Sequence, residues 1–305
     1  MSNLNKYQGV FPAFYACYDE QGNVSLERTR AFAEYLIEQG VNGLYVGGSS
    51  GECIYQDVQE RMDVLEAVMA VAKGKVAVIA HVACNNTRDS QKLAAHAESV
   101  GVDAIASIPP IYFKLPEHAI AKYWNDISAA APNTDFIIYN IPVLAGVALT
   151  RPLLREMRKN PRMIGVKNSS MVTMDIEQFK AEGGEDFVVF NGPDEQFVAG
   201  RVMGACGGIG GTYATMPELF LAMDKHIKAG EMDKAFAIQT EVNAIILTLC
   251  SAKGNMYAVN KAVIEKRTGL KLGSVRLPLA PLFDGDEKVV EKAAAMTDEA
   301  IRKYC

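Results

Sequence analysis

A lysine and a tyrosine each stand at the polar end of a short apolar run. Lys167 follows Gly-Val in the run that begins at Met163, and Tyr139 follows Ile-Ile in the run that begins at Phe136. Burial disfavours the charged form of a lysine, so a lysine at the end of a buried strand has a lowered pKa and some neutral amine at pH 7. A neutral amine attacks the ketone of a 2-keto acid, and the resulting iminium withdraws electrons while a carbon–carbon bond forms or breaks. A nearby phenol would supply the proton shuttle that this chemistry requires.

Both residues also have ordinary structural interpretations. Lys167 could form a salt bridge or extend its amine to solvent, which is the more frequent role of a lysine. Tyr139 could be a packed aromatic whose hydroxyl is satisfied locally. Neither residue taken alone decides between structure and catalysis.

A third polar strand end favours catalysis. Residues 47–52 read Gly-Gly-Ser-Ser-Gly-Glu, and such a turn presents backbone N–H groups and the hydroxyls of Ser49 and Ser50 to an anion. Alone, this turn is typical of any strand-to-helix connection. Together with Lys167 and Tyr139, it predicts a site for a small 2-keto acid.

Eight short apolar runs alternate with amphipathic stretches, a pattern typical of repeated βα units and a parallel sheet. Residues 25–40 illustrate the helical stretches, with Ser25 as the expected N-cap and Gly40 just after the C-terminus. We expect an α/β fold, a (β/α)8 TIM barrel, whose active site lies at the C-terminal ends of the strands. An open doubly wound sheet is the alternative, but the GxGxxG turn typical of that fold is missing. The runs begin at Gly9, Gly43, Val76, Asp103, Phe136, Met163, Phe187 and Cys206.

The chain of 305 residues fits one domain. Beyond about residue 216 only helical patterns occur, without a low-complexity linker. We expect residues 1–228 to form the barrel and residues 229–305 a C-terminal helical extension packed against it.

Composition and charge narrow the classes of partner and cofactor. The formal net charge is -5, and no Lys/Arg cluster is interleaved with aromatics, so we expect no nucleic-acid partner. No apolar segment is long enough for a membrane span, and the six cysteines include no CxxC pair, so we expect a cytoplasmic protein. We expect no metal and no other cofactor, because the histidines form no HxH or HExxH pair. These histidines are His81, His96, His118 and His226.

The motifs GGSSGE, YNIP, GVKNSS, NGPDE and GGIGGTY occur in this order at the expected strand ends. This combination resembles the N-acetylneuraminate lyase and dihydrodipicolinate synthase superfamily over essentially the whole chain. The resemblance implies a class I aldolase on a (β/α)8 barrel with a C-terminal helical extension, usually tetrameric. It implies that Lys167 is the Schiff-base lysine, that Tyr139 relays protons, and that Ser49 and Ser50 bind the pyruvate carboxylate.

The resemblance also implies roles for residues outside this group. Tyr112, in the segment PPIYF, would reach into a neighbouring subunit's site, in keeping with a homotetramer. Ile209 would lend its backbone carbonyl to the pocket.

Two segments distinguish the branches of the superfamily. The synthase branch has an arginine shortly after its YN-Pro motif, where this chain has YNIPVLAGV with Leu144. The segment NGPDE is similar to the one that binds the sugar's hydroxyl chain in the lyases. The predicted activity is therefore cleavage of sialic acid to pyruvate and N-acetylmannosamine. The implied sugar-binding residues are Ser169, Gly192, Asp194 and Glu195.

Some observations leave alternatives open. Asp194 and Glu195 are also typical of acids at a helix N-terminus. Gly211 stands where the lyases have a serine that binds the sugar chain, and losing one such hydrogen bond costs roughly 0.5–1.5 kcal/mol.

Other functions remain as alternatives to the lyase. Dihydrodipicolinate synthase or another 2-keto-3-deoxy acid aldolase is the first alternative, and a non-catalytic keto-acid-binding regulator is the second. A phosphate-sugar isomerase, with residues 207–211 as a phosphate cradle, gives no role to Lys167 and Tyr139 together.

Overall fold

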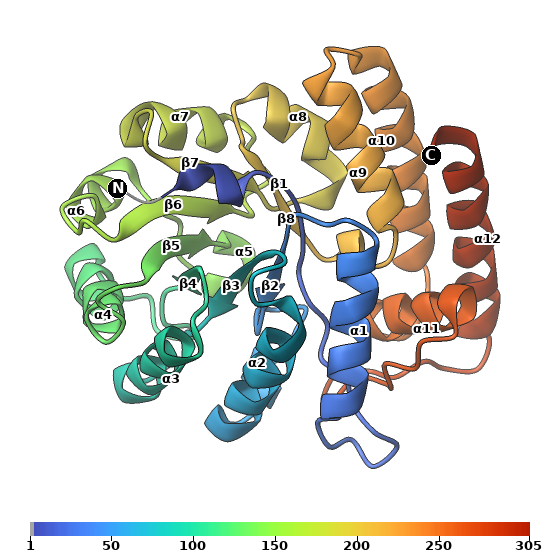
Figure 1. Ribbon diagram of the computed structural model, residues 1–305, viewed down its shortest axis with the longest axis horizontal. Helices are drawn as coiled ribbons and strands as arrows, with labels where there is room; N and C mark the ends of the chain where they lie inside the picture. The colour runs from blue at the N-terminus through green and yellow to red at the C-terminus, as the bar shows by residue number, and fades with distance from the viewer. Residues whose placement is uncertain (1–2) are drawn as a thin grey trace.

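A computed structural model describes residues 3–305, and its centre is a ring of eight parallel strands (Figure 1). Neighbours pair in the order β1-β8-β7-β6-β5-β4-β3-β2, and a parallel bridge between Ala13 and Tyr45 joins β1 to β2 where the ring closes. The expected (β/α)8 TIM barrel is confirmed. The strands are β1 (Gly9–Pro12), β2 (Gly43–Val46), β3 (Ala77–His81), β4 (Ala104–Ser107), β5 (Asp135–Asn140), β6 (Met163–Asn168), β7 (Val188–Asn191) and β8 (Gly207–Gly210).

Every residue of the eight strands is buried, because alternate side chains face the barrel interior and the surrounding helices. Phe11, Tyr45 and Tyr139 belong to the interior cluster, whereas Val46 and Val166 pack in the outer layer. All eight expected strands are present. The first strand ends at Pro12, before the end of its apolar run, and Ala13 then pairs with Tyr45 in an isolated parallel bridge.

Helices follow the strands and cover the outside of the barrel (Figure 1). α1 begins as expected: the Ser25 hydroxyl accepts a hydrogen bond from the Arg28 N–H at 3.4 Å. Gly40 follows its C-terminus with a φ of 86°. The remaining helices that surround the strands are α2 (Val58–Ala72), α3 (Thr87–Val100), α4 (Glu117–Ala129), α5 (Pro142–Ala145), α6 (Arg151–Met157), α7 (Met174–Gly183), α8 (Phe197–Val202) and α9 (Pro217–Lys228), with α1 spanning Leu26–Glu38.

Three further helices, α10 (Met232–Leu249), α11 (Met256–Thr268) and α12 (Asp286–Tyr304), lie together on one side of the barrel, beside α1 and α9 (Figure 1). α10 packs against α8 and α9, and α12 packs against α9, α10 and α11. A second apolar cluster fills the space between them. The C-terminal helices are therefore joined to the barrel by an apolar core of their own.

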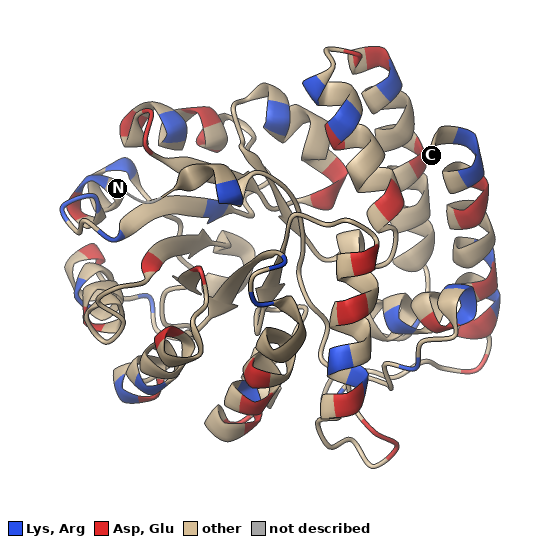
Figure 2. Cartoon of the chain, viewed as in Figure 1, with Lys and Arg blue, Asp and Glu red and all other residues tan. Residues whose placement is uncertain are grey.

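The outer helices carry acidic and basic residues in a mixed distribution (Figure 2). This differs from the one-sided basic stripe that is typical of nucleic-acid-binding proteins. Within residues 3–305, none of the helices has both the length and the apolar composition needed to cross a bilayer.

Candidate active site

Lys167 lies on β6 with only 4% of its surface exposed. Its amine makes no ion pair or hydrogen bond within residues 3–305, so neither ordinary interpretation of this lysine applies. The Nζ atom lies 4.2 Å from the ring centroid of Tyr45 and 4.0 Å from that of Tyr139. Burial lowers the pKa of Lys167 to about 7, although the nearby Asp194 carboxylate acts in the opposite direction. Far more of the amine is therefore neutral at pH 7 than in an exposed lysine.

Tyr139 is the direct neighbour of Lys167, since the two residues are paired in the register of β5 and β6. Burial raises the pKa of the Tyr139 phenol to about 12, and hydrogen-bonding interactions with the Ser49 and Ser169 hydroxyls partly offset this rise. The phenol is therefore protonated at neutral pH and has hydroxyls beside it. The structure therefore brings together four of the predicted site residues, Lys167, Tyr139, Ser49 and Ser169.

The turn after β2 has the close packing that its glycines predict. Gly47 has a φ of 73°, and a Cβ on Gly48 would lie 2.6 Å from the Tyr45 ring. The Ser49 carbonyl accepts a hydrogen bond from the Glu52 N–H at 3.0 Å. Ser50 is buried, and its hydroxyl interacts with the phenol of Tyr257 on α11. One face of the turn therefore touches Tyr139 and another touches a C-terminal helix.

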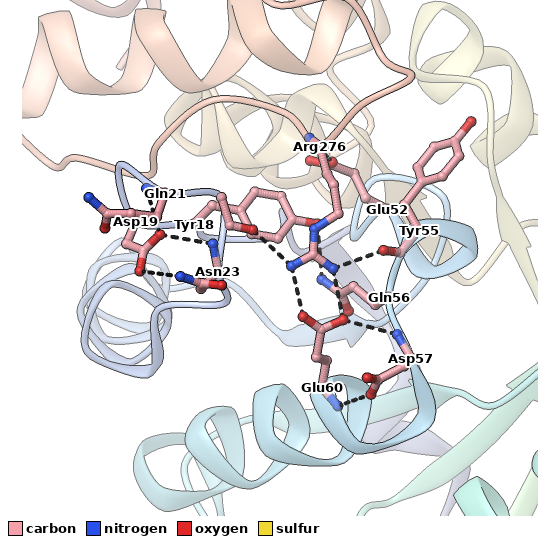
Figure 3. Close-up of polar contacts among 11 residues, drawn as sticks. Tyr18, Asp19, Gln21, Asn23, Glu52, Tyr55, Gln56, Asp57, Glu60 and Arg276 are labelled. Atoms are coloured by element: carbon pink, nitrogen blue, oxygen red, sulfur yellow. Dashed lines mark hydrogen bonds and ion pairs between the residues drawn. The ribbon is translucent and has the colours of Figure 1, made fainter.

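Glu52 ties this turn to the C-terminal part of the chain. Its buried carboxylate accepts hydrogen bonds from the Lys261 amine at 2.6 Å and from the Arg276 N–H at 2.8 Å. The Arg276 guanidinium in turn contacts both carboxylate oxygens of Glu60 at 2.7 Å and the Tyr55 carbonyl at 2.8 Å (Figure 3). Sequence reasoning missed this network, because Glu52 and its partners are far apart in the chain.

Asp194 begins the short 3-10 helix η3 (Asp194–Gln196), and its side chain is buried. The carboxylate accepts hydrogen bonds from the Thr212 N–H at 2.6 Å and from the Thr212 hydroxyl at 2.5 Å. Burial raises the pKa of Asp194 to about 7, against these hydrogen bonds and the influence of Lys167. Asp194 therefore faces the same interior as Lys167 and does not cap a helix in solvent.

Ser169 and Gly192 are in close contact. The Gly192 N–H donates to the Asn168 carbonyl at 2.7 Å, and a Cβ on Gly192 would lie 2.0 Å from the Ser169 hydroxyl oxygen. Only glycine fits at position 192.

At the end of β8, Ile209 is fully buried, and a Cβ on Gly211 would lie 3.3 Å from the Ser50 hydroxyl oxygen.

Two predicted site residues, Tyr112 and Glu195, are exposed, unlike the buried Lys167, Tyr139 and Asp194. Tyr112 is 90% exposed, has a φ of 83°, and packs edge-to-face on Phe113. It lines a cavity of about 620 Å³ between the starts of α3 and α4, together with Asn85 and Lys122. Glu195 is exposed, and its carbonyl accepts a hydrogen bond from Asn243 on α10.

Sequence reasoning missed Tyr45, Thr212 and Tyr257 as parts of the site. The alternation along β2 places Tyr45 inside the barrel, and this was the one signal available in the sequence.

His81 accepts a hydrogen bond from the Ile108 N–H and contacts the Gly47 carbonyl at 2.9 Å, and burial lowers its pKa to about 3. It is therefore a neutral, hydrogen-bonded rim histidine, in keeping with its position at the end of β3. Within residues 3–305, no three His, Cys, Asp or Glu side chains lie together as metal ligands would.

A family model of the dihydrodipicolinate synthetase family matches residues 6–297. The chain belongs to the dihydrodipicolinate synthetase family. Within this family, it is 62% identical to an N-acetylneuraminate lyase of Mediterraneibacter gnavus over 304 residues, which cover 100% of this chain and 96% of that protein. It is 34% identical to an N-acetylneuraminate lyase of Escherichia coli over 97% of this chain and 98% of that protein.

The fold of this chain also matches those of solved structures. A Ruminococcus gnavus sialic acid aldolase described as a catalytic lysine mutant superposes with a TM-score of 0.99 at 62% identity, covering 100% of both chains. The Clostridium difficile protein CdNal, in complex with mannosamine, gives a TM-score of 0.88 at 26% identity, covering 98% of this chain and 99% of that one. The resemblance that the five motifs indicated is confirmed.

Proposed function

We propose that this chain is a class I aldolase that cleaves N-acetylneuraminate to pyruvate and N-acetylmannosamine through a Schiff base on Lys167. The observation that carries the proposal is an unpaired, buried lysine amine beside a protonated phenol and a turn of glycines and serines. The names of the relatives support it, since those at 62% and 34% identity are N-acetylneuraminate lyases. A related aldolase described as a catalytic lysine mutant supports a lysine as the nucleophile.

The chemistry begins at the open-chain keto form of the substrate. The neutral Lys167 amine attacks the C2 ketone, and the ketone oxygen leaves as water after taking one proton from the nitrogen and one from Tyr139. The Tyr139 phenolate, a strong base because of its raised pKa, then takes the proton of the C4 hydroxyl. The C3–C4 bond breaks, its electrons enter the iminium to form an enamine, and C4 becomes the aldehyde of N-acetylmannosamine. Protonation at C3 and hydrolysis of the imine release pyruvate and restore the amine.

The surrounding residues hold the two halves of the substrate. The turn with Ser49 and Ser50 binds the carboxylate, and the Ile209 carbonyl borders the pocket. Ser169, Gly192, Asp194 and Glu195 bind the sugar chain, because each buried hydroxyl without a partner costs about 1–3 kcal/mol. Leu144 on α5 occupies the position where the synthase branch has its arginine, which favours the lyase over the synthase reaction.

We also propose a cytoplasmic homotetramer in which Tyr112 completes a neighbouring subunit's site. The support is an exposed aromatic after β4 and several further exposed apolar side chains in the segments that follow β2, β4, β5 and β6. These side chains are Ile54, Phe113, Val143, Leu144 and Met171, each more than half exposed.

The test is borohydride trapping with pyruvate, peptide mapping and a pyruvate-release assay on N-acetylneuraminate. Wild-type protein should be trapped at Lys167 and release pyruvate. Lys167→Ala should lose at least about 10³-fold in turnover, because the electron sink is removed. With cyanoborohydride, which is stable in acid, the rate of trapping should fall about tenfold per pH unit below pH 7, as the amine becomes protonated.

Lys159→Ala is the matched control, since the Lys159 side chain is 74% exposed on the surface. It should be trapped and should turn over like the wild type. Trapping without pyruvate release would keep the aldolase mechanism and redirect the search to other keto acids. Full activity in Lys167→Ala would refute the mechanism.

A further inference from the structure

The Lys167 amine lies between two aromatic rings, and the proposed mechanism gives no role to the ring of Tyr45. Its Nζ atom is near the ring faces of Tyr45 and Tyr139, and these two rings meet edge-to-face with centroids 5.8 Å apart. No ion pair within residues 3–305 compensates the charge that the nitrogen acquires as an iminium. We propose that the rings of Tyr45 and Tyr139 form an aromatic clamp that stabilises the cationic nitrogen of the Lys167 iminium.

Tyr45 contributes its ring rather than its hydroxyl. The side chain is fully buried inside the barrel, and its hydroxyl has no hydrogen-bond partner within residues 3–305. The turn that follows β2 holds the ring in place, because Gly48 packs directly against it. Burial raises the pKa of the Tyr45 phenol well above its ordinary value, so it remains neutral. A neutral ring attracts a cation through its π face.

In the described part of the chain, none of the other titratable groups near the amine forms an ion pair with the cationic nitrogen, which leaves the two rings to stabilise it. Asp194, on η3, acts on the amine electrostatically, but it forms no ion pair with it and is engaged by Thr212. Burial raises the pKa of the Cys53 thiol, which begins the 3-10 helix η2 (Cys53–Tyr55), so this group is neutral. His81, on β3, is neutral as well, because burial lowers its pKa to about 3.

The clamp predicts an effect that depends on pH. At low pH the free amine is an ammonium ion, so the free enzyme and the imine both carry a cation between the rings. Removal of one ring then weakens both states and leaves the equilibrium between them unchanged. At high pH the free amine is neutral, and only the iminium gains from the rings. Loss of a ring should therefore weaken imine formation at high pH alone.

This inference rests on the proposed Schiff base, and its test is trapping with cyanoborohydride, a reductant stable at pH 5.5 and pH 9. The quantity measured is the pyruvate concentration that gives half-maximal trapping. For Tyr45→Leu this concentration should rise about tenfold at pH 9 relative to wild type and stay within about twofold at pH 5.5. Tyr45→Phe should restore it to within about threefold at both pH values, since the ring is kept and the lost hydroxyl had no partner. Asp194 titrates in every variant, so each comparison is made against wild type at the same pH.

Thermal unfolding of each variant reports on folding, and Tyr45→Met is the substitute if Tyr45→Leu does not fold. An equal weakening at both pH values, or the same weakening in Tyr45→Phe, would overturn the clamp and indicate a purely structural role. If wild-type protein is not trapped at all, the proposed Schiff base itself fails, and the clamp fails with it.

Discussion

The difference between Lys167 and Lys261 shows what makes a buried lysine reactive. Both are almost fully buried, and burial lowers the pKa of each. Lys261 donates to Glu52 at 2.6 Å and to the Ser274 carbonyl at 2.8 Å, so its amine is held as a structural cation. Lys167 has aromatic faces in place of an anion. The absence of an ion-pair partner, rather than burial alone, leaves a neutral amine available for attack.

Gly211→Ser should strengthen binding of the sugar. Gly211 has ordinary helical backbone angles, so a serine adds no backbone strain, and its Cβ would lie 3.3 Å from the Ser50 hydroxyl oxygen. One added neutral hydrogen bond is worth about 0.5–1.5 kcal/mol, which predicts a KM for N-acetylneuraminate about 2- to 10-fold lower. Half-maximal trapping with pyruvate, which has no sugar chain, serves as the control and should be unchanged. A raised value for both ligands would mean that the added atoms displace Ser50.

The residues that could be predicted from the sequence are those whose positions follow from the barrel itself. Ser49, Tyr139 and Lys167 end or follow the second, fifth and sixth apolar runs, and the C-terminal ends of parallel strands meet at one rim. Tyr257 could not be found this way, since it comes from α11, outside the eight βα units. Thr212 was missed because its contribution is a hydrogen bond to a carboxylate, which no local pattern indicates.

At the scale of elements, α11 packs from outside the barrel against the turn formed by residues 47–52. Tyr257 contacts Ser50, and Lys261, one helical turn later, binds Glu52 in the same turn segment. Glu52 has a φ of 53°, so the turn holds a non-glycine residue in the left-handed region close to Ser49 and Ser50, the residues proposed to bind the carboxylate. The C-terminal helices were expected to pack on the barrel, and they do. A boundary at residue 229 stays a prediction.

The ion pair between Glu52 and Lys261 should be costly to break from either side. Glu52→Gln or Lys261→Met leaves one buried charge unpaired, which should lower the free energy of unfolding by about 3–5 kcal/mol. The KM for pyruvate should rise as the turn loosens. The measurements are urea unfolding and steady-state kinetics.

The double variant Glu52→Gln, Lys261→Met removes both charges and should recover most of the lost stability. Lys266→Met is the control on the same helix, because the Lys266–Glu291 pair is exposed and should contribute about 0–1 kcal/mol. Additive losses in the double variant would show that the two side chains are not coupled.

At the scale of the molecule, one rim of the barrel carries both the chemistry and a set of exposed apolar side chains. The α/β class and the number of strands could be predicted, because alternation and strand length are local properties of the sequence. The local pattern could not predict which apolar side chains after the strands are exposed, because an exposed apolar residue has the same local pattern there as a buried one. Tyr112 illustrates this: it is 90% exposed, and it lines a cavity with α3 and α4 residues instead of the Lys167 group.

Complementation between two inactive variants tests whether Tyr112 acts across subunits. Tyr112→Phe should lower turnover about 10- to 100-fold if the hydroxyl takes part in proton transfer, and Lys167→Ala should abolish it. In a mixed oligomer, a subunit with Tyr112→Phe keeps its own Lys167 and receives an intact Tyr112 from a Lys167→Ala neighbour. Hybrids purified through two different tags should therefore recover roughly a quarter to a half of wild-type turnover, because each mixed pair rebuilds one complete site. Hybrids of wild type and Lys167→Ala calibrate the assay, and activity no higher than the mean of the two variants would place Tyr112 outside the neighbour's site.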